Sequence, residues 1–243
     1  MDGLSAPGWA SYSAVRLLQF GDSVFPVGSF TFSNGLEMAV QVGVVRDRET
    51  LREYVRTVTR QAATSDAIAL LAGHRAAVAG DVDGIRRADE AVLLRKLTDE
   101  TRTMTIRMGR KLAEAASRIV GDSVLDKRFR ATESAARSAI DAPVPVTYPV
   151  ALGAVAAAVG LSEQDAFAAH QYGTAMVVLS AALRLMRVDH LDVQEILFAV
   201  NAAVADDYRD VATASLEDMR AFAPVVDVLA AAHRHAHVRM FMN

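Results

Sequence analysis

The segment from Ser162 to about Met186 constrains the fold more than any other part of the sequence. Ser162 and Asp165 form a capping pair at its start, and the residues that follow are apolar nearly all the way round a helix. Its most apolar stretch, residues 175–183, ends at Arg184 and is far shorter than the ~20 residues that span a bilayer. The segment therefore predicts a buried helix at the centre of a bundle.

The remaining segments also show helical rather than strand periodicity. Apolar residues recur at spacings of three and four, as at Met104, Met108 and Leu112, and no convincing run alternates as a strand does. Hydrophobic residues make up 52% of the chain but aromatic residues only 6%. The core must therefore be built from Ala, Val, Leu and Met, of which Ala and Leu favour helices. We expect an all-α, single-domain bundle of about eight to ten helices over residues 1–243.

Capping and breaking residues predict where the segments begin and end. Thr50 and Glu53 match a capping box that opens a long helix to about residue 79. Three prolines within residues 141–149 predict an extended connection. The last helix is expected over about 216–237. Residues 1–10 are expected to form a flexible arm, and residues 238–243 a tail whose order depends on a partner.

Several classes of function are disfavoured by what the sequence lacks. The net charge of −3 does not resemble the basic footprint of a nucleic-acid-binding protein. Cysteine is absent, so disulfides, thiolate metal sites and a cysteine nucleophile are excluded. P-loop, H-E-x-x-H and G-x-S-x-G motifs are also missing. We therefore expect a non-catalytic binding partner without a cofactor.

The N-terminus does not predict secretion. Asp2 is acidic, and no apolar stretch of a secretory signal follows it. The lack of disulfides fits the cytoplasm. We expect a cytoplasmic protein with no membrane contact.

The stretch from Phe25 to Glu37 is the most distinctive loop in the chain. Pro26 fixes one φ angle and Gly28 permits a positive one, which predicts a stiff turn. Asn34 and Glu37 are spaced as a capping pair for the next helix. The three phenylalanines at 25, 30 and 32 could all enter the core, or ring and loop could form part of a docking face.

The C-terminal string contains half of the six histidines of the chain. On a helix, His233 and His237 lie on one side and could share a metal, whereas in an extended tail His235 joins them. Neutral imidazole suits nickel, zinc or copper. The alternative is a solvated, basic helix end, where His and Arg favour the negative end of the helix dipole. We expect a partner to cover Met240, Phe241 and Met242, the apolar residues near the end of this string, because exposing them would be costly.

Two charged groups have simpler interpretations. Residues 206–210, with three Asp, one Tyr and one Arg, favour a solvated linker over a cation site because no EF-hand spacing is present. Glu53, Arg56 and Arg60 fit an exposed helix face with pairing at spacings of three and four. His74 and His170 are expected at the edge of the core.

At this point the motifs suggest a family. Residues 17–45 closely resemble the opening of UreF-type urease accessory proteins, which carry a leucine-rich helix and then P-x-G-[GSA]-[FY]-x-[FY]-S-x-G-[LI]-E. The residues at matching positions are Pro26, Gly28, Phe30, Phe32, Ser33, Gly35, Leu36 and Glu37. Residues 148–153, YPVALG, and 180–185, SAALRL, are similar to two further family segments. His233 and Arg239-Met240-Phe241 resemble the family tail H-E-x-x-x-x-R-L-F, although Arg234 replaces its Glu.

The resemblance implies a function as well as a fold. UreF-like proteins are all-α, usually dimeric, and catalyse no reaction. They bind a UreD/UreH-type scaffold through a surface that includes the C-terminal tail, recruit a UreG-type GTPase, and dock on apo-urease so that nickel is inserted. The residues implied in partner binding are Pro26, Gly28, Phe30, Phe32, Ser33, Glu37, Tyr148, His233, Arg239, Met240 and Phe241.

Two alternatives to this adaptor remain. The first is a direct nickel metallochaperone of the same family, with His233, His235 and His237 as ligands. The second is a helical enzyme that uses Glu37 or His170 as a general base. The second alternative is weaker because no nucleophile–base pair or cofactor motif accompanies those residues.

Overall fold

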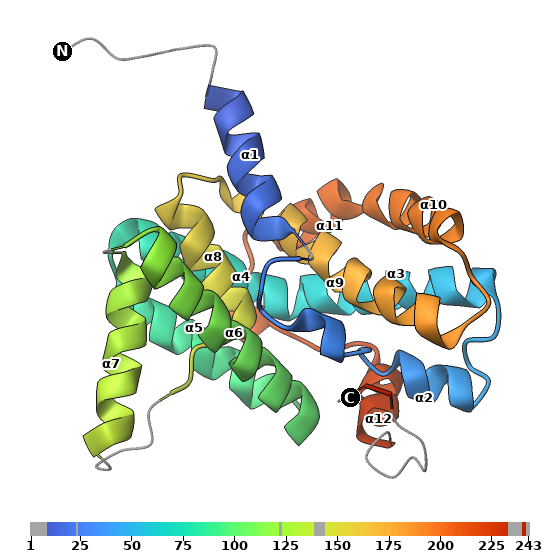
Figure 1. Cartoon of the computed structure of the whole chain (residues 1–243). Coiled ribbons are helices and arrows are strands. Elements are labelled where there is room, and N and C mark those ends of the chain that lie inside the picture. The colour runs from blue at the N-terminus through green and yellow to red at the C-terminus, as the bar shows by residue number, and fades with distance from the viewer. Residues whose placement is uncertain (1–8, 23, 122, 139–143, 233–239, 242–243) are drawn as a thin grey trace.

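The computed structural model describes residues 9–22, 24–121, 123–138, 144–232 and 240–241 (Figure 1). These residues form α-helices and two short 3-10 turns, with no strand among them, so the all-α prediction is confirmed. The elements are α1 Trp9–Gly21, η1 Ser29–Thr31, α2 Leu36–Gln41, α3 Arg48–Thr64, α4 Asp66–Ala79, α5 Val82–Arg95, α6 Asp99–Ile119, α7 Val124–Ser138, α8 Tyr148–Ala158, α9 Glu163–Leu185, α10 His190–Asn201, α11 Val204–Val211, η2 Leu216–Asp218 and α12 Pro224–Ala232.

The described residues contain twelve α-helices rather than the eight to ten predicted, because the helix expected over 50–79 is divided and α11 forms where a linker was expected. Two of the expected helices also differ in their bounds. The helix expected over 50–79 breaks at Ser65, where φ is −126° and ψ is −90°. It also begins earlier, because Asp47 and Thr50 form the capping box in place of Thr50 and Glu53. The helix expected from residue 216 is a 3-10 turn first, and α12 begins only at Pro224.

The tightest helix contact, between α4 and α8, depends on glycine. A Cβ added at Gly153 would lie 2.2 Å from the Leu70 carbonyl oxygen, and one at Gly73 would lie 2.9 Å from the Val150 side chain. The two helices can approach so closely only because these positions carry no side chain. Every residue of α8 from Pro149 to Ala156 is buried.

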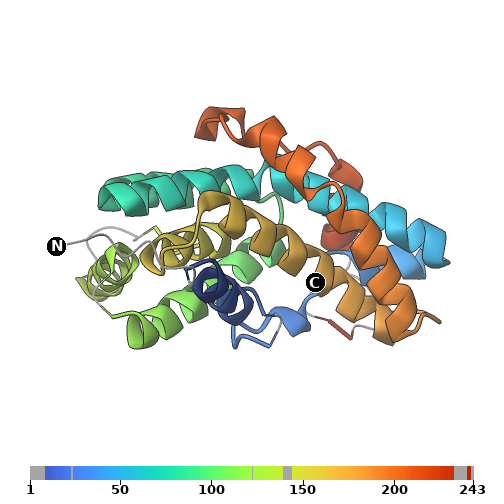
Figure 2. The same ribbon diagram turned by 90° about the horizontal axis from the view of Figure 1, so that it is seen from above.

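The centre of the protein is shared between α8 and α9. Helix α9, the predicted central helix, packs against α1, α2, α3, α4, α8, α10 and α11. Figure 2 shows α3 and α4 end to end along one side of α9, with α10 and α11 crossing over α3. The most completely enclosed helix is nevertheless α8, so no single helix holds the centre alone.

Helix α9 is also the described helix that is long and apolar enough to cross a membrane. This judgement rests on length and composition alone, and 56% of its most apolar 18-residue stretch is buried inside the protein. A buried core helix passes the same test, as the sequence predicted for this segment.

The two ends of the described chain lie on different parts of the fold. Helix α1 packs on α9, whereas α12 packs against α2 and α6 (Figure 1). The last described residues therefore lie beside the turn that precedes α2, although the two segments are separated by most of the sequence.

Candidate partner-docking site

The turn from Pro26 to Glu37 is built on three left-handed backbone positions. Gly28 has φ +79°, and Asn34 and Gly35 follow with φ +51° and +78°. Thr31 donates both its backbone N–H and its hydroxyl to the Gly28 carbonyl, at 3.4 and 2.9 Å. The successive left-handed residues reverse the chain into α2, and Gly35 meets this need without a steric cost.

Gly35 is also required because of its neighbours. A Cβ at this position would lie 2.9 Å from the Tyr54 hydroxyl and 3.2 Å from the Val226 carbonyl oxygen. Tyr54 donates its hydroxyl to the Asn34 carbonyl at 2.7 Å, and burial raises the pKa of Tyr54. The turn is therefore held between α3 and α12 with no room for a side chain.

The three phenylalanines of the loop have different environments. Phe32 is buried, and Phe25 is partly buried with its ring centroid 5.4 Å from that of Phe20. Phe30 is 65% exposed. Both expectations for these rings therefore hold in part: two rings stabilise the core, and one is presented on the surface.

Glu37 binds the C-terminal tail. Its carboxylate is buried and accepts the backbone N–H of Met240 at 2.7 Å on one oxygen and that of Phe241 at 3.1 Å on the other. The prediction that Asn34 and Glu37 cap α2 is wrong, because the N-cap residue is Gly35 and no side chain caps it. Residues 240–241 are thereby seated on the turn.

Arg184 joins the turn and the tail from α9. Its guanidinium donates to the Phe30 carbonyl at 2.9 Å and lies over the Phe241 ring, 4.1 Å from the ring centroid. The Phe241 side chain is buried beneath it. A cation over an aromatic face is favourable, and more so when partly desolvated. We call the assembly of residues 26–37, Arg184 and residues 240–241 the turn–tail site.

A cavity of about 360 Å³ lies behind the turn–tail site. The turn contributes Phe30 and Asn34 to its wall, α8 contributes Tyr148, and α9 contributes His170. Tyr148, which was expected at a partner surface, lines the cavity. Its ring is stacked on that of His170, with the two ring centroids 6.5 Å apart. Burial raises the pKa of Tyr148 to about 12.

His170 is a buried cavity residue and not the core-edge residue expected. Burial lowers the pKa of its imidazole to about 4, so the ring is neutral at physiological pH. Its Nδ1 atom has no hydrogen-bond partner in the described residues. Asp66 and Lys96, which form an ion pair at 2.6 Å, are on the wall of the same cavity.

The surface around the turn–tail site is apolar. Met240 is 58% exposed, and Phe222, Val225 and Val228 on and before α12 are also exposed. Their neighbours on α12, Val226 and Ala230, line the cavity together with Phe30. A group of exposed apolar side chains around a preformed turn is typical of a docking surface.

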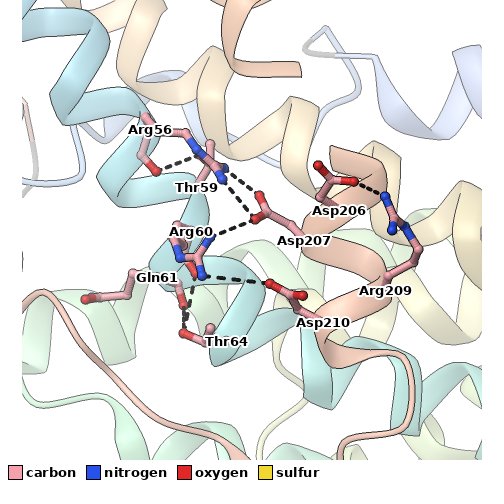
Figure 3. A network of polar contacts seen from close by, with 9 residues as sticks. All are labelled: Arg56, Thr59, Arg60, Gln61, Thr64, Asp206, Asp207, Arg209 and Asp210. Carbon is pink, nitrogen blue, oxygen red and sulfur yellow. Dashed lines mark hydrogen bonds and ion pairs between the residues drawn. The ribbon is translucent and has the colours of Figure 1, made fainter. Parts of the chain in front are cut away.

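A polar network ties α11 to α3 elsewhere on the molecule (Figure 3). Asp207 is buried and accepts two hydrogen bonds from the Arg56 guanidinium, at 2.5 and 2.9 Å, while Arg60 approaches it at 3.5 Å. The Asp207 carboxylate raises the pKa of Arg56. The expectation of a solvated linker at 206–210 is wrong: these residues are helical because the apolar face of α11 and Asp207 both pack inward.

Part of the predicted site lies outside the described residues, namely His233, His235, His237 and Arg239. Within the described residues, no group of three or more His, Asp or Glu side chains is placed to hold a metal ion. Pro26 and Ser33 belong to the turn, and Ser33 is fully buried. The residues that sequence reasoning missed are Arg184 and Tyr54. Arg184 belongs to the SAALRL match, but that match gave no indication of its contacts.

The described residues form an all-helical protein, and its candidate site is a partly apolar surface of the kind that docks a partner. Comparison with known proteins gives the family. The UreF family model matches residues 45–201. The chain belongs to the UreF family of urease accessory proteins.

Relatives from two genera match nearly the whole chain. The chain is 51% identical over 229 residues to urease accessory protein UreF 2 of Brucella canis, covering 94% of this chain and 91% of that protein. It is 51% identical over 229 residues to UreF 1 of Brucella melitensis, covering 94% and 92%. It is 47% identical over 230 residues to UreF of Yersinia enterocolitica, covering 94% and 97%.

Proposed function

We propose that this protein is a non-catalytic adaptor in the maturation of urease. It binds a UreD/UreH-type scaffold and a UreG-type GTPase in the cytoplasm, and the assembly acts on apo-urease so that nickel is inserted. Family membership supports the role in maturation. The chain carries no P-loop of its own, which fits a system where nucleotide chemistry belongs to a partner.

The observation that carries the adaptor role is the turn–tail site. Glu37 and Arg184 fix a turn and a tail together, and both present apolar side chains outward from this junction. Phe30 and Met240 are the exposed members. Because their backbones are already held, a partner can bind both without the entropy cost of ordering them. We assign the scaffold to this surface.

The protein acts as a homodimer through a second apolar surface. Leu18 on α1 is 71% exposed and Phe198 on α10 is 83% exposed. A groove of about 700 Å³ is lined by α1, α9 and residues at the α10–α11 junction, and Leu18 forms part of its wall. Two copies related by a two-fold axis bury such a face against itself, which is the usual geometry of a dimer.

The test of the adaptor role is co-expression with the scaffold and GTPase of the same urease system, followed by size-exclusion chromatography with light scattering. Wild type is expected to elute with the scaffold. A chain that ends at Val238, and a full chain with Met240→Ser, should lose the scaffold while circular dichroism shows an intact fold. Val78→Ser is the control, because Val78 is 71% exposed on α4. A scaffold complex unchanged by both tail variants would overturn the assignment.

The test of the dimer uses the same light-scattering measurement on the chain alone. Wild type is expected at twice the monomer mass of 26.1 kDa. The double variant Leu18→Glu/Phe198→Glu should run as a folded monomer, because like charges would face each other across the two-fold axis. Leu94→Glu is the control, since Leu94 is 80% exposed on α5. A dimer that survives the double variant would place the interface elsewhere.

A further inference from the structure

The cationic side chains of α6 and α7 form an exposed stripe that neither the family assignment nor the turn–tail site uses. Residues 99–138 hold nine Arg and Lys against six Asp and Glu, whereas the remainder of the chain holds seventeen against twenty-three. Among the described side chains of this segment, seven Arg and Lys are exposed against two Asp and Glu, so a chain with a net charge of −3 carries a positively charged surface here. Such an uneven distribution steers and orients partners.

The cations of α6 lie on one face of the helix. Arg107, Lys111 and Arg118 are all exposed, and their spacing of four and then seven residues places them along one side. At a rise of 1.5 Å per residue, the stripe is roughly 16 Å long between Arg107 and Arg118. The opposite face of α6 is buried through Met108 and Leu112.

Helix α7 extends the stripe sideways. Arg110 on α6 pairs with Glu133 on α7 at 3.3 Å, so the exposed faces of the two helices lie side by side. Lys127 and Arg130 on α7 are also exposed, and Arg130 pairs with Asp126 at 2.7 Å. Figure 1 shows α6 and α7 as neighbours on the same side of the protein.

The stripe reaches the turn–tail site. A Cβ built on Gly28 would lie 3.1 Å from the Lys111 ammonium nitrogen, so Lys111 stands directly beside the turn. The apolar docking surface and the basic stripe are therefore continuous. Charge around an apolar centre is the arrangement that speeds association and fixes the orientation of a partner.

We infer that the α6–α7 stripe binds an acidic surface of the scaffold, the protein assigned above to the turn–tail site. The continuity of the stripe with an apolar surface favours a protein, because a phosphate backbone offers no apolar counterpart to Phe30 and Met240. The inference rests on the proposed adaptor function and adds the charge of the surface that the partner presents.

The test measures binding of the scaffold, the GTPase and apo-urease, each immobilised separately, at low and high salt. Arg107→Glu/Lys111→Glu is expected to weaken association with the scaffold by about tenfold or more at low salt, and by much less near 1 M salt, where screening lengths fall to ~3 Å. Arg86→Glu/Arg87→Glu on α5 is the charge-matched control, because both arginines are exposed and their ion pairs are made within or next to α5. Arg107→Gln/Lys111→Gln, which introduces no new charge, should have a smaller effect in the same direction.

Three outcomes would overturn the inference and are distinguishable from one another. If the wild-type protein binds the scaffold and the Arg107→Glu/Lys111→Glu variant binds it equally well, the stripe has no role in binding, while the adaptor function stands. If wild type binds none of the three proteins, the adaptor function fails and the inference fails with it. If wild type binds a duplex RNA probe at low micromolar concentration and the Glu variant abolishes this, the partner is a nucleic acid and not an acidic protein.

Discussion

Replacing Glu37 with Gln isolates the contact that seats the tail on the turn. The two side chains have nearly the same shape, but Gln offers one acceptor where Glu37 offers two. One of the bonds from Met240 and Phe241 would then be replaced by an amide N–H facing a backbone N–H. A hydrogen bond to a charged group contributes roughly 1.5–3 kcal/mol, and an unsatisfied buried donor costs a similar amount. We expect the docking of the tail to weaken by about 2–3 kcal/mol.

Amide hydrogen exchange measured by NMR checks this value directly. A loss of 2–3 kcal/mol corresponds to roughly 30- to 150-fold faster exchange of the Met240 and Phe241 amides, because 1.36 kcal/mol is a factor of ten. Core amides of α8 should keep their rates, since the tail opens locally. Glu53→Gln is the control, as Glu53 is exposed on α3. Tail exchange within about threefold of wild type in Glu37→Gln would refute the assigned role of Glu37.

Three further predictions concern stability. Gly35→Ala should lower the free energy of unfolding by about 2 kcal/mol or more in urea titrations, because φ is +78° and the new Cβ meets Tyr54. Gly43→Ala, with φ +75° and open space, should cost only about 1 kcal/mol. Between pH 6.5 and pH 4 the unfolded chain binds a proton at His170 that the folded chain does not, so His170→Phe should remove up to ~3 kcal/mol of the acid destabilisation. Arg56→Met should cost about 2–4 kcal/mol, because the buried carboxylate of Asp207 would keep only its longer contact with Arg60.

Each of these has a result that contradicts it. Equal costs for Gly35→Ala and Gly43→Ala would show that the neighbours of Gly35 can move aside. An unchanged stability difference between pH 7 and pH 4 in His170→Phe would mean that His170 is not kept neutral in the fold. For Arg56→Met, the double variant with Asp207→Leu should restore much of the stability, and failure to do so would assign the cost to packing.

The helical class and the stiff turn of the candidate site were predictable because both rest on local patterns. Periodicity and capping residues such as Ser162 and Asp165 act within a few residues, and that capping box is present in the structure. The stiff turn at Pro26–Gly28 follows from the conformational limits of the residues themselves. These features can be predicted without knowing any contact between residues that are distant in the sequence.

The roles that could not be predicted are those that depend on contacts across the fold. Glu37 has the spacing of a cap, yet its carboxylate binds amides 203 and 204 residues away. Asp207 sits in a run of polar residues that resembles a linker, yet Arg56 on α3 pairs with it and permits its burial. His170 has no sequence feature that distinguishes a cavity wall from a core edge. Partners distant in the sequence decide each case.

The distance in sequence between Glu37 and its tail partners has a consequence for biosynthesis. The turn is made early in translation, but its carboxylate stays without the Met240 and Phe241 amides until those residues have been synthesised. Domains fold as their N-terminal parts emerge, so the helices can form well before the turn–tail site is complete. A chain that stops short of Phe241 would carry the core and lack the finished docking surface. Under the proposed adaptor function, binding of the scaffold is therefore expected only of chains that have been translated through to the tail.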